Sequence, residues 1–445
     1  MRLPRRTAIA MPALLALPRP LAAAAAQDRP LFGTELSTLP NGLTVARIPR
    51  PDSPVAVHMI WVKAGSTQDP EKRSGTAHFL EHMMFKGTPT LPAGGFSRAI
   101  ARMGGADNAF TSQDVTAYHQ EIAAEDLARA MRMEADRFVH ALIPDDQIAP
   151  EREVVIEERR QRTDNSPRSR FREALTAALW GDHPRGRPVI GWPDDIRAIT
   201  RDDLAGFHLG RYAPGNAVLV VQGGPEETPE LIAEIWGSVP SRAFVARSEP
   251  PPPAAATLPR LERRERGIGD PAFIRAWIAP SLTTGDTQHA LPLEILTGVF
   301  GGGPAGRLHR ALIEPSLATA AYARYDSESA GASEFSLLAA PRSDVEPGRL
   351  EAAIDALLGE LIEHGPTEAE VARAIRQATS GALLSLDSAQ GAARVVGSTL
   401  ATGLSLDMAE FWPKHVAAVT APQVHAAAQA VLGRGPSLTG WLLPA

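Results

Sequence analysis

The chain of 445 residues contains no cysteine. Its folding therefore cannot depend on disulfide bonds, and a cysteine nucleophile or a thiolate metal site is excluded, so any bound metal must be held by His, Asp or Glu. No stretch beyond the N-terminal segment reaches about 18 uninterrupted apolar residues, the length of a membrane-spanning helix. The apolar fraction of 44%, with 45 basic and 51 acidic residues, is typical of a globular protein large enough for two or three domains.

Residues 1–26 differ in composition from the rest of the chain. Three arginines among the first six residues precede an apolar stretch over residues 8–17, and a run of small residues ends at Ala26, which offers a cleavage point. The alternative, an anchor helix, is disfavoured because the apolar stretch is too short to cross a bilayer and prolines interrupt it. We expect a signal peptide, a periplasmic or secreted protein, and no integral membrane segment after cleavage.

The charge balance bears on the partners of the protein. Without residues 1–26 the chain has 41 basic and 51 acidic residues, a formal charge of −10. This charge disfavours nucleic acid as a partner, and a negative surface field favours basic or neutral substrates over acidic ones.

A proline-rich segment divides the chain into two halves. Residues 248–262 are expected to form a semi-rigid linker between a first domain over residues 27–247 and a second over residues 263–445. The hydrophobic pattern predicts a similar order of elements in both halves, which indicates an internal duplication with a period of about 200 residues. The first half is expected to contain strands 42–48, 55–62, 109–122 and 216–222 and helices 77–85, 124–140 and one beginning near Pro150. The second is expected to contain strands 272–278 and others within 318–340, and helices 289–300, 349–364 and one after Thr367.

The first helix of the first half carries the sequence His78-Phe79-Leu80-Glu81-His82. Residues four apart lie on one face of a helix, so both imidazoles can reach one metal ion, while Glu81 lies beside the open position of that metal. This is the inverted zinc motif H-x-x-E-H. The pattern also arises by chance in proteins of this size, so a third ligand is needed to support it.

The third ligand is expected in the helix that begins near Pro150. Glu158 follows Val155 by three positions and Val154 by four, so it shares their face, whereas Glu157 points outward. A carboxylate on an apolar face is costly unless it is paired or binds a cation, which makes Glu158 the candidate. Glu151, two turns earlier on the same face, is expected to assist catalysis by orienting a ligand histidine or adjusting the base.

These residues and several blocks around them resemble the insulinase, pitrilysin and mitochondrial processing peptidase family of zinc metallopeptidases. The family pattern, H-x-x-E-H followed about 76 residues later by a ligand Glu, falls on His78, Glu81, His82 and Glu158. The resemblance covers almost the whole chain beyond the N-terminal segment, and further blocks similar to the family lie at residues 75–77, 85–88, 108–111 and 183–191.

The resemblance implies an α+β fold of two homologous domains, each a mostly antiparallel sheet covered by helices, with no zinc motif in the second. It implies one Zn²⁺ per chain, held by His78, His82 and Glu158, with Glu81 as the general base. It also implies that a chain of this length pairs with a second chain to enclose a chamber, as a dimer. The strand containing Asn108, Ala109 and Phe110 is expected to bind an extended peptide substrate by strand addition.

One family feature is missing from the second half. Relatives often carry an Arg and a Tyr about seven residues apart, and the corresponding positions here are Ile313 and Ala320; Tyr322 and Tyr325 lie nearby but out of register. A companion chain that supplies the missing pair would make a heterodimer, and a homodimer is the alternative.

The sequence therefore predicts an exported zinc metalloendopeptidase that hydrolyses peptides or unfolded polypeptide segments. A non-catalytic structural subunit of a larger complex is the main alternative, but a scaffold would not need Glu81. Zinc-dependent hydrolysis of a non-peptide amide or ester is compatible with the ligands and fits a chamber poorly.

Overall fold

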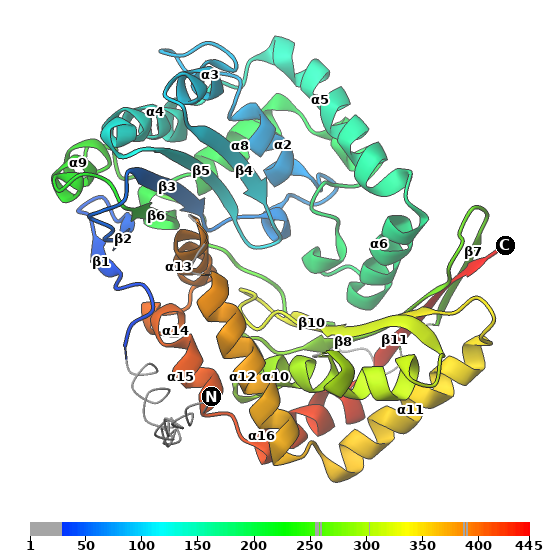
Figure 1. Cartoon of the computed structure of the whole chain (residues 1–445). Coiled ribbons are helices and arrows are strands. Elements are labelled where there is room, and N and C mark those ends of the chain that lie inside the picture. Colours follow the sequence, from blue (N-terminus) through cyan, green and yellow to red (C-terminus); the bar gives the residue numbers. More distant parts are fainter. Residues whose placement is uncertain (1–28, 254–257, 259, 302, 386–387, 389) are drawn as a thin grey trace, which may run out of the picture.

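The computed structural model describes residues 29–253, 258, 260–301, 303–385, 388 and 390–445 (Figure 1). The expected signal peptide over residues 1–26 and part of the proline-rich segment lie outside these residues. Within the described part of the chain, no helix is both long enough and apolar enough to cross a membrane.

The first sheet has six strands in the order β1-β2-β6-β3-β5-β4, and only β2 and β6 run parallel. Its central strand β3 is buried along nearly its whole length, which explains its almost continuous run of apolar residues. The strands are β1 (Glu35–Thr38), β2 (Thr44–Ile48), β3 (Val55–Val62), β4 (Ala106–Thr111), β5 (Thr116–Ala123) and β6 (Ala217–Gln222).

The second sheet has five strands in the order β7-β11-β8-β10-β9, and only β7 and β11 run parallel. With β1 set aside, the strands of both sheets follow the same order along the chain, so the α+β class with two related halves is confirmed. The strands are β7 (Leu261–Glu265), β8 (Ala272–Ala279), β9 (Ala318–Arg324), β10 (Ser333–Pro341) and β11 (Ser437–Pro444). The last two residues of the expected linker therefore belong to β7.

Each sheet has a helical layer from its own half on one face (Figure 1). Over the first sheet lie α2 (Thr76–Met83), α3 (Gly95–Arg102), α4 (Leu127–His140), α8 (Arg201–Arg211) and α9 (Thr228–Ile235). The helix α5 (Asp145–Arg159) packs against α2, and α7 (Pro193–Ala198) packs against α5. Over the second sheet lie α10 (Ala290–Phe300), α11 (Pro347–His364), α12 (Glu368–Ser385), α15 (Trp412–Ala417) and α16 (Ala421–Ala428).

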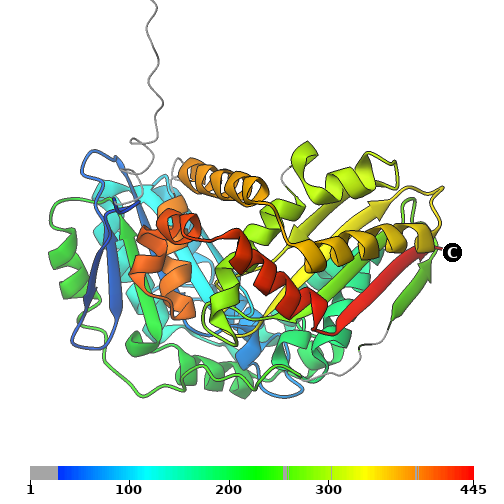
Figure 2. The same cartoon turned by 90° about the horizontal axis from the view of Figure 1, so that it is seen from below.

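The opposite face of each sheet is covered by a helix from the other half. Because successive strand residues point to opposite faces, β3 packs Ile60 under α4 and turns Trp61 toward α13 (Gly391–Thr402). Reciprocally, Phe171 and Leu175 of α6 (Pro167–Trp180) pack on the second sheet. Viewed from below, the orange segment of the second half, which includes α14 (Leu406–Glu410), reaches the blue strands of the first half (Figure 2).

Two local predictions were wrong. The strand predicted over residues 109–122 is a hairpin of β4 and β5, because the hydroxyl of Ser112 accepts hydrogen bonds from the amides of Asp114 and Val115 and so forms a tight turn. The helix expected to begin near Pro150 begins five residues earlier, and Pro150 lies inside α5. Packing of buried residues such as Ile148 on both sides of the proline maintains the helix despite the missing donor.

Gly397 of α13 provides a test of the contact between the halves. A Cβ atom at this position would collide with the indole ring of Trp61, which is buried. We expect Gly397→Ala to lower the free energy of unfolding by about 1–3 kcal/mol, because the rigid ring must be displaced. Chemical denaturation followed by fluorescence measures the change. The control is Gly359→Ala in α11, because a Cβ at this position meets no atom within 4 Å. This control should raise the free energy of unfolding by about 0.5–1 kcal/mol. Unchanged stability in Gly397→Ala would contradict the packing of Gly397 against Trp61.

Candidate active site

The helix α2 is held in place at its N-terminus by backbone contacts that only glycine permits. Gly75 and Gly191 both have positive φ, at 92° and 93°, and a Cβ on either would collide with the backbone of the other segment. The carboxylate of Asp69 accepts hydrogen bonds from the amides of Gly75 and Ala77 at 2.7 and 2.8 Å, satisfying donors at the start of the helix. Burial raises the pKa of Asp69 to about 7, against the effect of these bonds.

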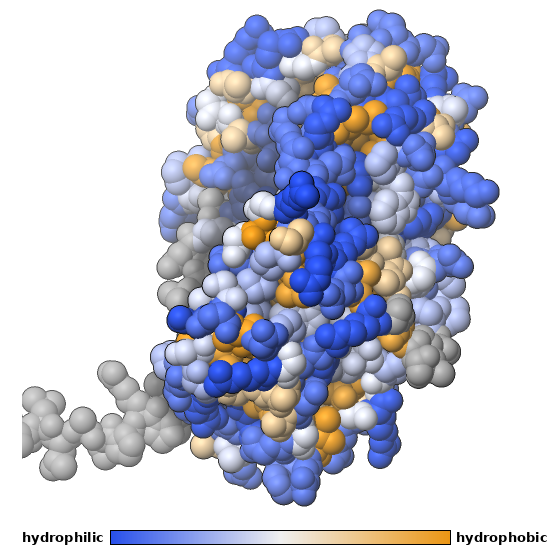
Figure 3. Space-filling view, turned by 90° about the vertical axis from the view of Figure 1, so that its right-hand side faces the viewer, coloured by the Kyte–Doolittle hydropathy of each residue, from blue (hydrophilic) through white to orange (hydrophobic). Residues whose placement is uncertain are grey.

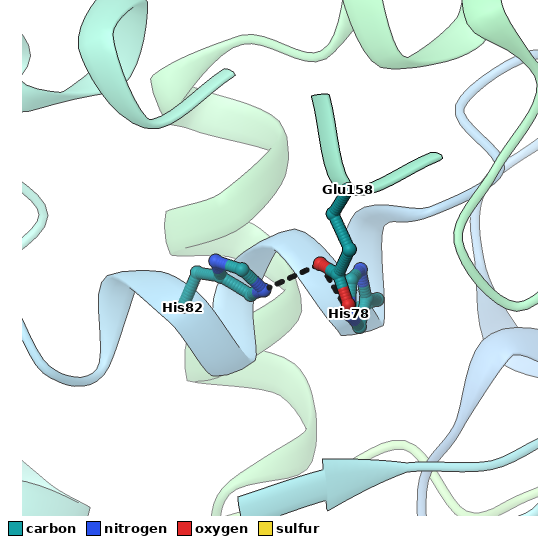
Figure 4. Close-up of side chains that lie close together, drawn as sticks. All are labelled: His78, His82 and Glu158. Atoms are coloured by element: carbon teal, nitrogen blue, oxygen red, sulfur yellow. Dashed lines mark ion pairs between the residues drawn. The ribbon is translucent and has the colours of Figure 1, made fainter. Parts of the chain in front are cut away.

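The structure brings His78, His82 and Glu158 together (Figure 4). The two histidines project from one face of α2, and Glu158 points between them from α5. One oxygen of Glu158, Oε2, lies 3.6 Å from Nε2 of His78 and 3.3 Å from Nε2 of His82, and one ligand atom from each residue lies within 4.8 Å of the others. Glu157, its neighbour, pairs with Arg160 on the exposed side of the helix, as the helical spacing indicates.

The donor set fits a divalent cation of the zinc type. Two imidazole nitrogens and one carboxylate oxygen match the ligands of catalytic zinc sites, which leave a fourth position open. The Oε2 atom of Glu158 is buried and has no hydrogen-bond partner among the described residues, although two imidazole nitrogens face it. A buried charged oxygen without a hydrogen bond is costly, and a cation shared with His78 and His82 would satisfy it. Arg162 contacts the other oxygen, Oε1, at 2.6 Å.

Glu151 lies behind one of these histidines. Its Oε1 is 2.9 Å from Nδ1 of His82, and its Oε2 forms an ion pair with Lys86. With the proton on Nδ1 donated to Glu151, Nε2 of His82 presents its lone pair to a metal. Burial alone would lower the pKa of His82, but the contacts with Glu151 and Glu158 raise it to about 9. His78 differs, because burial lowers its pKa to about 4.

Glu81 lies on α2 between the two histidines in sequence and is nearly buried, with 9% of its surface exposed. Its Oε2 accepts a hydrogen bond of 2.6 Å from the hydroxyl of Thr111 at the end of β4. Burial raises the pKa of Glu81, an effect partly offset by this hydrogen bond. The carboxylate is thus held beside the cluster without being part of it.

His78, Glu81, His82 and Glu158 all line one cleft of about 770 Å³. The residues expected to bind substrate, Asn108, Ala109 and Phe110, line the same cleft on β4, the edge strand of the first sheet. An edge strand offers unpaired backbone groups to an extended peptide. Val154, which the sequence places on the buried face of α5, is 49% exposed and lines the cleft as well.

The sequence analysis predicted no role for several residues that contact the site. Thr111, Lys86 and Arg162 contact Glu81, Glu151 and Glu158, respectively. Thr111 and Lys86 lie in blocks that resemble the family, but only the tertiary structure shows their partners. Arg162 lies four positions after Glu158, a helical spacing for an ion pair.

The positions that correspond to the Arg and Tyr of relatives lie in the second half. Ile313 ends a short helical turn (His309–Ile313), and Ala320 lies in β9 opposite Ala340. Nearby, the hydroxyl of Tyr325 donates to the carbonyl of Pro280, while Tyr322 is 46% exposed.

Comparison with known proteins agrees with the fold and the motif. Residues 44–192 match the family described as "Insulinase (Peptidase family M16)", and residues 198–378 match the "Peptidase M16 inactive domain". An "uncharacterized zinc protease" of Mycobacterium leprae is 32% identical, covering 89% of each chain. The mitochondrial-processing peptidase subunit beta of Lentinula edodes is 28% identical, covering 83% of this chain and 81% of that protein. The crystal structure of a protease from Helicobacter pylori has a TM-score of 0.82 and 25% identity, covering 94% of this chain and all of the other. On these matches and on its fold, the chain belongs to the insulinase family of peptidases, M16.

Proposed function

We propose that this chain is an exported zinc endopeptidase that hydrolyses peptides or unfolded polypeptide segments inside a chamber formed with a second chain. The observation that carries the proposal is the convergence of His78, His82 and Glu158 on one point beside Glu81, in a cleft bordered by an edge strand. The mycobacterial relative is named a zinc protease, which supports zinc as the metal and peptide hydrolysis as the reaction. The composition of residues 1–26 supports export to the periplasm or out of the cell.

The residues have distinct tasks in this reaction. His78, His82 and Glu158 would hold Zn²⁺, which would lower the pKa of a coordinated water toward about 7 and polarise the scissile carbonyl. Glu81 takes the proton of that water and passes it to the leaving amine. Thr111 donates a hydrogen bond to one oxygen of Glu81 and so fixes this carboxylate, which would leave the other oxygen available for the water. Glu151 is a positioning residue, because it fixes the tautomer and ring orientation of His82.

Substrate binding uses the edge of the first sheet. A peptide that adds as a strand to β4 would pass Asn108, Ala109 and Phe110 and bring its backbone across the cleft to the metal ligands. Recognition through backbone hydrogen bonds requires an extended segment, which favours short peptides and unfolded chains over folded proteins.

Replacement of the base separates chemistry from metal binding. We expect Glu81→Gln to retain one zinc per chain and to lose peptide cleavage by about 10²–10⁴-fold, because an amide cannot accept the proton. Elemental analysis and a quenched fluorescent peptide measure the two properties. Glu157→Gln, which changes an exposed carboxylate on α5, is the matched control; undiminished turnover by Glu81→Gln would refute the assignment.

Replacement of the positioning carboxylate acts on the metal. Glu151→Gln should weaken zinc binding by about 10–100-fold, because the amide supports the imidazole of His82 less strongly than a carboxylate does. Competition with a chromophoric chelator gives the affinity. Glu153→Gln changes an exposed residue on the same helix and serves as control. Equal affinity in Glu151→Gln and the wild type would show that Glu151 does not support the site.

The proposed chamber predicts that activity depends on assembly. The relative named as a subunit supports pairing with a second chain, which is either a second copy or a companion carrying the Arg and Tyr absent at Ile313 and Ala320. We expect cleavage to fall when the chain is diluted until sedimentation shows a monomer. Full endopeptidase activity of the monomer would contradict the requirement for a partner.

A further inference from the structure

The active-site cleft continues into a second hollow of about 380 Å³. The two spaces share Arg162, Thr163, Pro188 and Val189 as a common wall, so a peptide in the cleft can extend a side chain into the hollow. The far wall is formed by α6, the helix that covers the second sheet. In the space-filling view of the face that carries α5 and α6, strongly hydrophilic side chains run down the middle of the face (Figure 3).

Arginines dominate the charge of this hollow. Arg168 and Arg172 lie one helical turn apart on α6, and Arg162 and Arg187 complete the lining. Like charges four positions apart on a helix repel each other. Among the described residues, neither Arg168 nor Arg172 has a carboxylate oxygen within the 4.0 Å of an ion pair. Arg168 and Arg172 thus bring positive charge to the hollow that no carboxylate among the described residues neutralises by contact.

The acidic groups near the hollow have other partners. Glu173 lines it but forms two hydrogen bonds with Arg159, at 2.7 and 2.8 Å. Glu334 of β10 is close enough for the charge of Arg172 to lower its pKa, but burial is the stronger effect and raises that pKa above its ordinary value. No ion pair joins Glu334 to Arg172 among the described side chains.

The other arginines are partly engaged. Arg168 donates to the carbonyl of Asp270 at 3.3 Å, which uses one of its five donor hydrogens. Arg187 donates to backbone carbonyls of the segment from Thr67 to Pro70, and Arg162 contacts Glu158. Arg168 and Arg172 consequently have the most donor capacity available for a ligand.

We propose that this hollow is a specificity subsite for an acidic side chain, Asp or Glu, of the peptide substrate, with Arg168 and Arg172 as the recognising residues. The inference rests on the proposed peptidase function and adds the class of substrate. Guanidinium groups bind carboxylates through paired, charge-assisted hydrogen bonds. The subsite selects acidic segments although the chain as a whole is acidic.

The substrate preference is measured with a series of matched peptides. A neutral quenched peptide is varied one position at a time on both sides of the scissile bond, with Asp, the isosteric Asn, or Lys at that position. At one position we expect kcat/KM for Asp to exceed that for Asn by about tenfold, mainly through a lower KM, with Lys below Asn. The ratio of Asp to Asn should shrink as the salt concentration rises, because ions screen the attraction.

Variants assign the preference to the two arginines. In the double variant Arg168→Gln, Arg172→Gln the ratio of Asp to Asn should fall to about one, and in Arg172→Glu the preference should turn toward Lys. The control double variant Arg129→Gln, Arg132→Gln removes the same charge from two exposed positions on α4 and should keep the wild-type ratio. A melting curve for each variant establishes that it is folded.

The outcomes separate the subsite from the proposed function. Equal cleavage of Asp and Asn peptides at every position, or a preference that survives in the double variant, would overturn the subsite while leaving the peptidase assignment intact. Failure to cleave the neutral peptide would count against the peptidase. In that case the subsite is tested by binding instead of cleavage. The Asp and Asn peptides are labelled with a neutral dye, and their affinities for the Glu81→Gln variant are compared. Tighter binding of the Asp peptide supports the subsite, and equal binding overturns it.

Discussion

The structure depends on the need to cover both faces of two sheets whose central strands are apolar on each side. Each half supplies helices for one face of its own sheet and one helix for the free face of the other sheet. The exchanged helices α6 and α13 bury aromatic and aliphatic side chains that would otherwise contact water, a contribution of about 25 cal/mol for each Å² of apolar surface removed. Glu410 adds a polar contact between the halves, accepting hydrogen bonds from the amides of Phe32, Gly33 and Thr34.

This exchange determines the geometry of the site. The chain runs from α5, which carries Glu158, through a short π-helical turn (Arg160–Asp164) into α6, which is anchored on the second sheet. The position of the third proposed ligand is therefore set by packing in both halves, while α2 is set within the first half by Asp69 and the contact of Gly75 with Gly191. Two rigid supports that meet at one point are what a metal centre with fixed ligand geometry requires.

The charged side chains in and around the cleft differ in their balance from the net charge of the chain. The sequence carries more acidic than basic residues, and the bulk field that follows favours basic or neutral partners. Locally, however, Lys86 faces Glu151 and Arg162 faces Glu158, and two arginines of α6, Arg168 and Arg172, line the adjoining hollow. At distances well below a Debye length, such neighbours outweigh the net charge, so the local arrangement governs which side chains the cleft accepts.

The sequence by itself determined the parts that depend on local periodicity and spacing. These are the positions of β3, β6 and most helices, the duplicated order of elements, and the shared faces that pair His78 with His82 and turn Glu158 away from Glu157. It did not determine where the hairpin between β4 and β5 turns, where α5 begins, or which helices cross between the halves, because these follow from hydrogen bonds and burial among residues distant along the chain. For the same reason only the tertiary structure decided that Thr111 contacts Glu81, that Lys86 contacts Glu151, and that α6 places beside the cleft two arginines with no ion pair to any described residue.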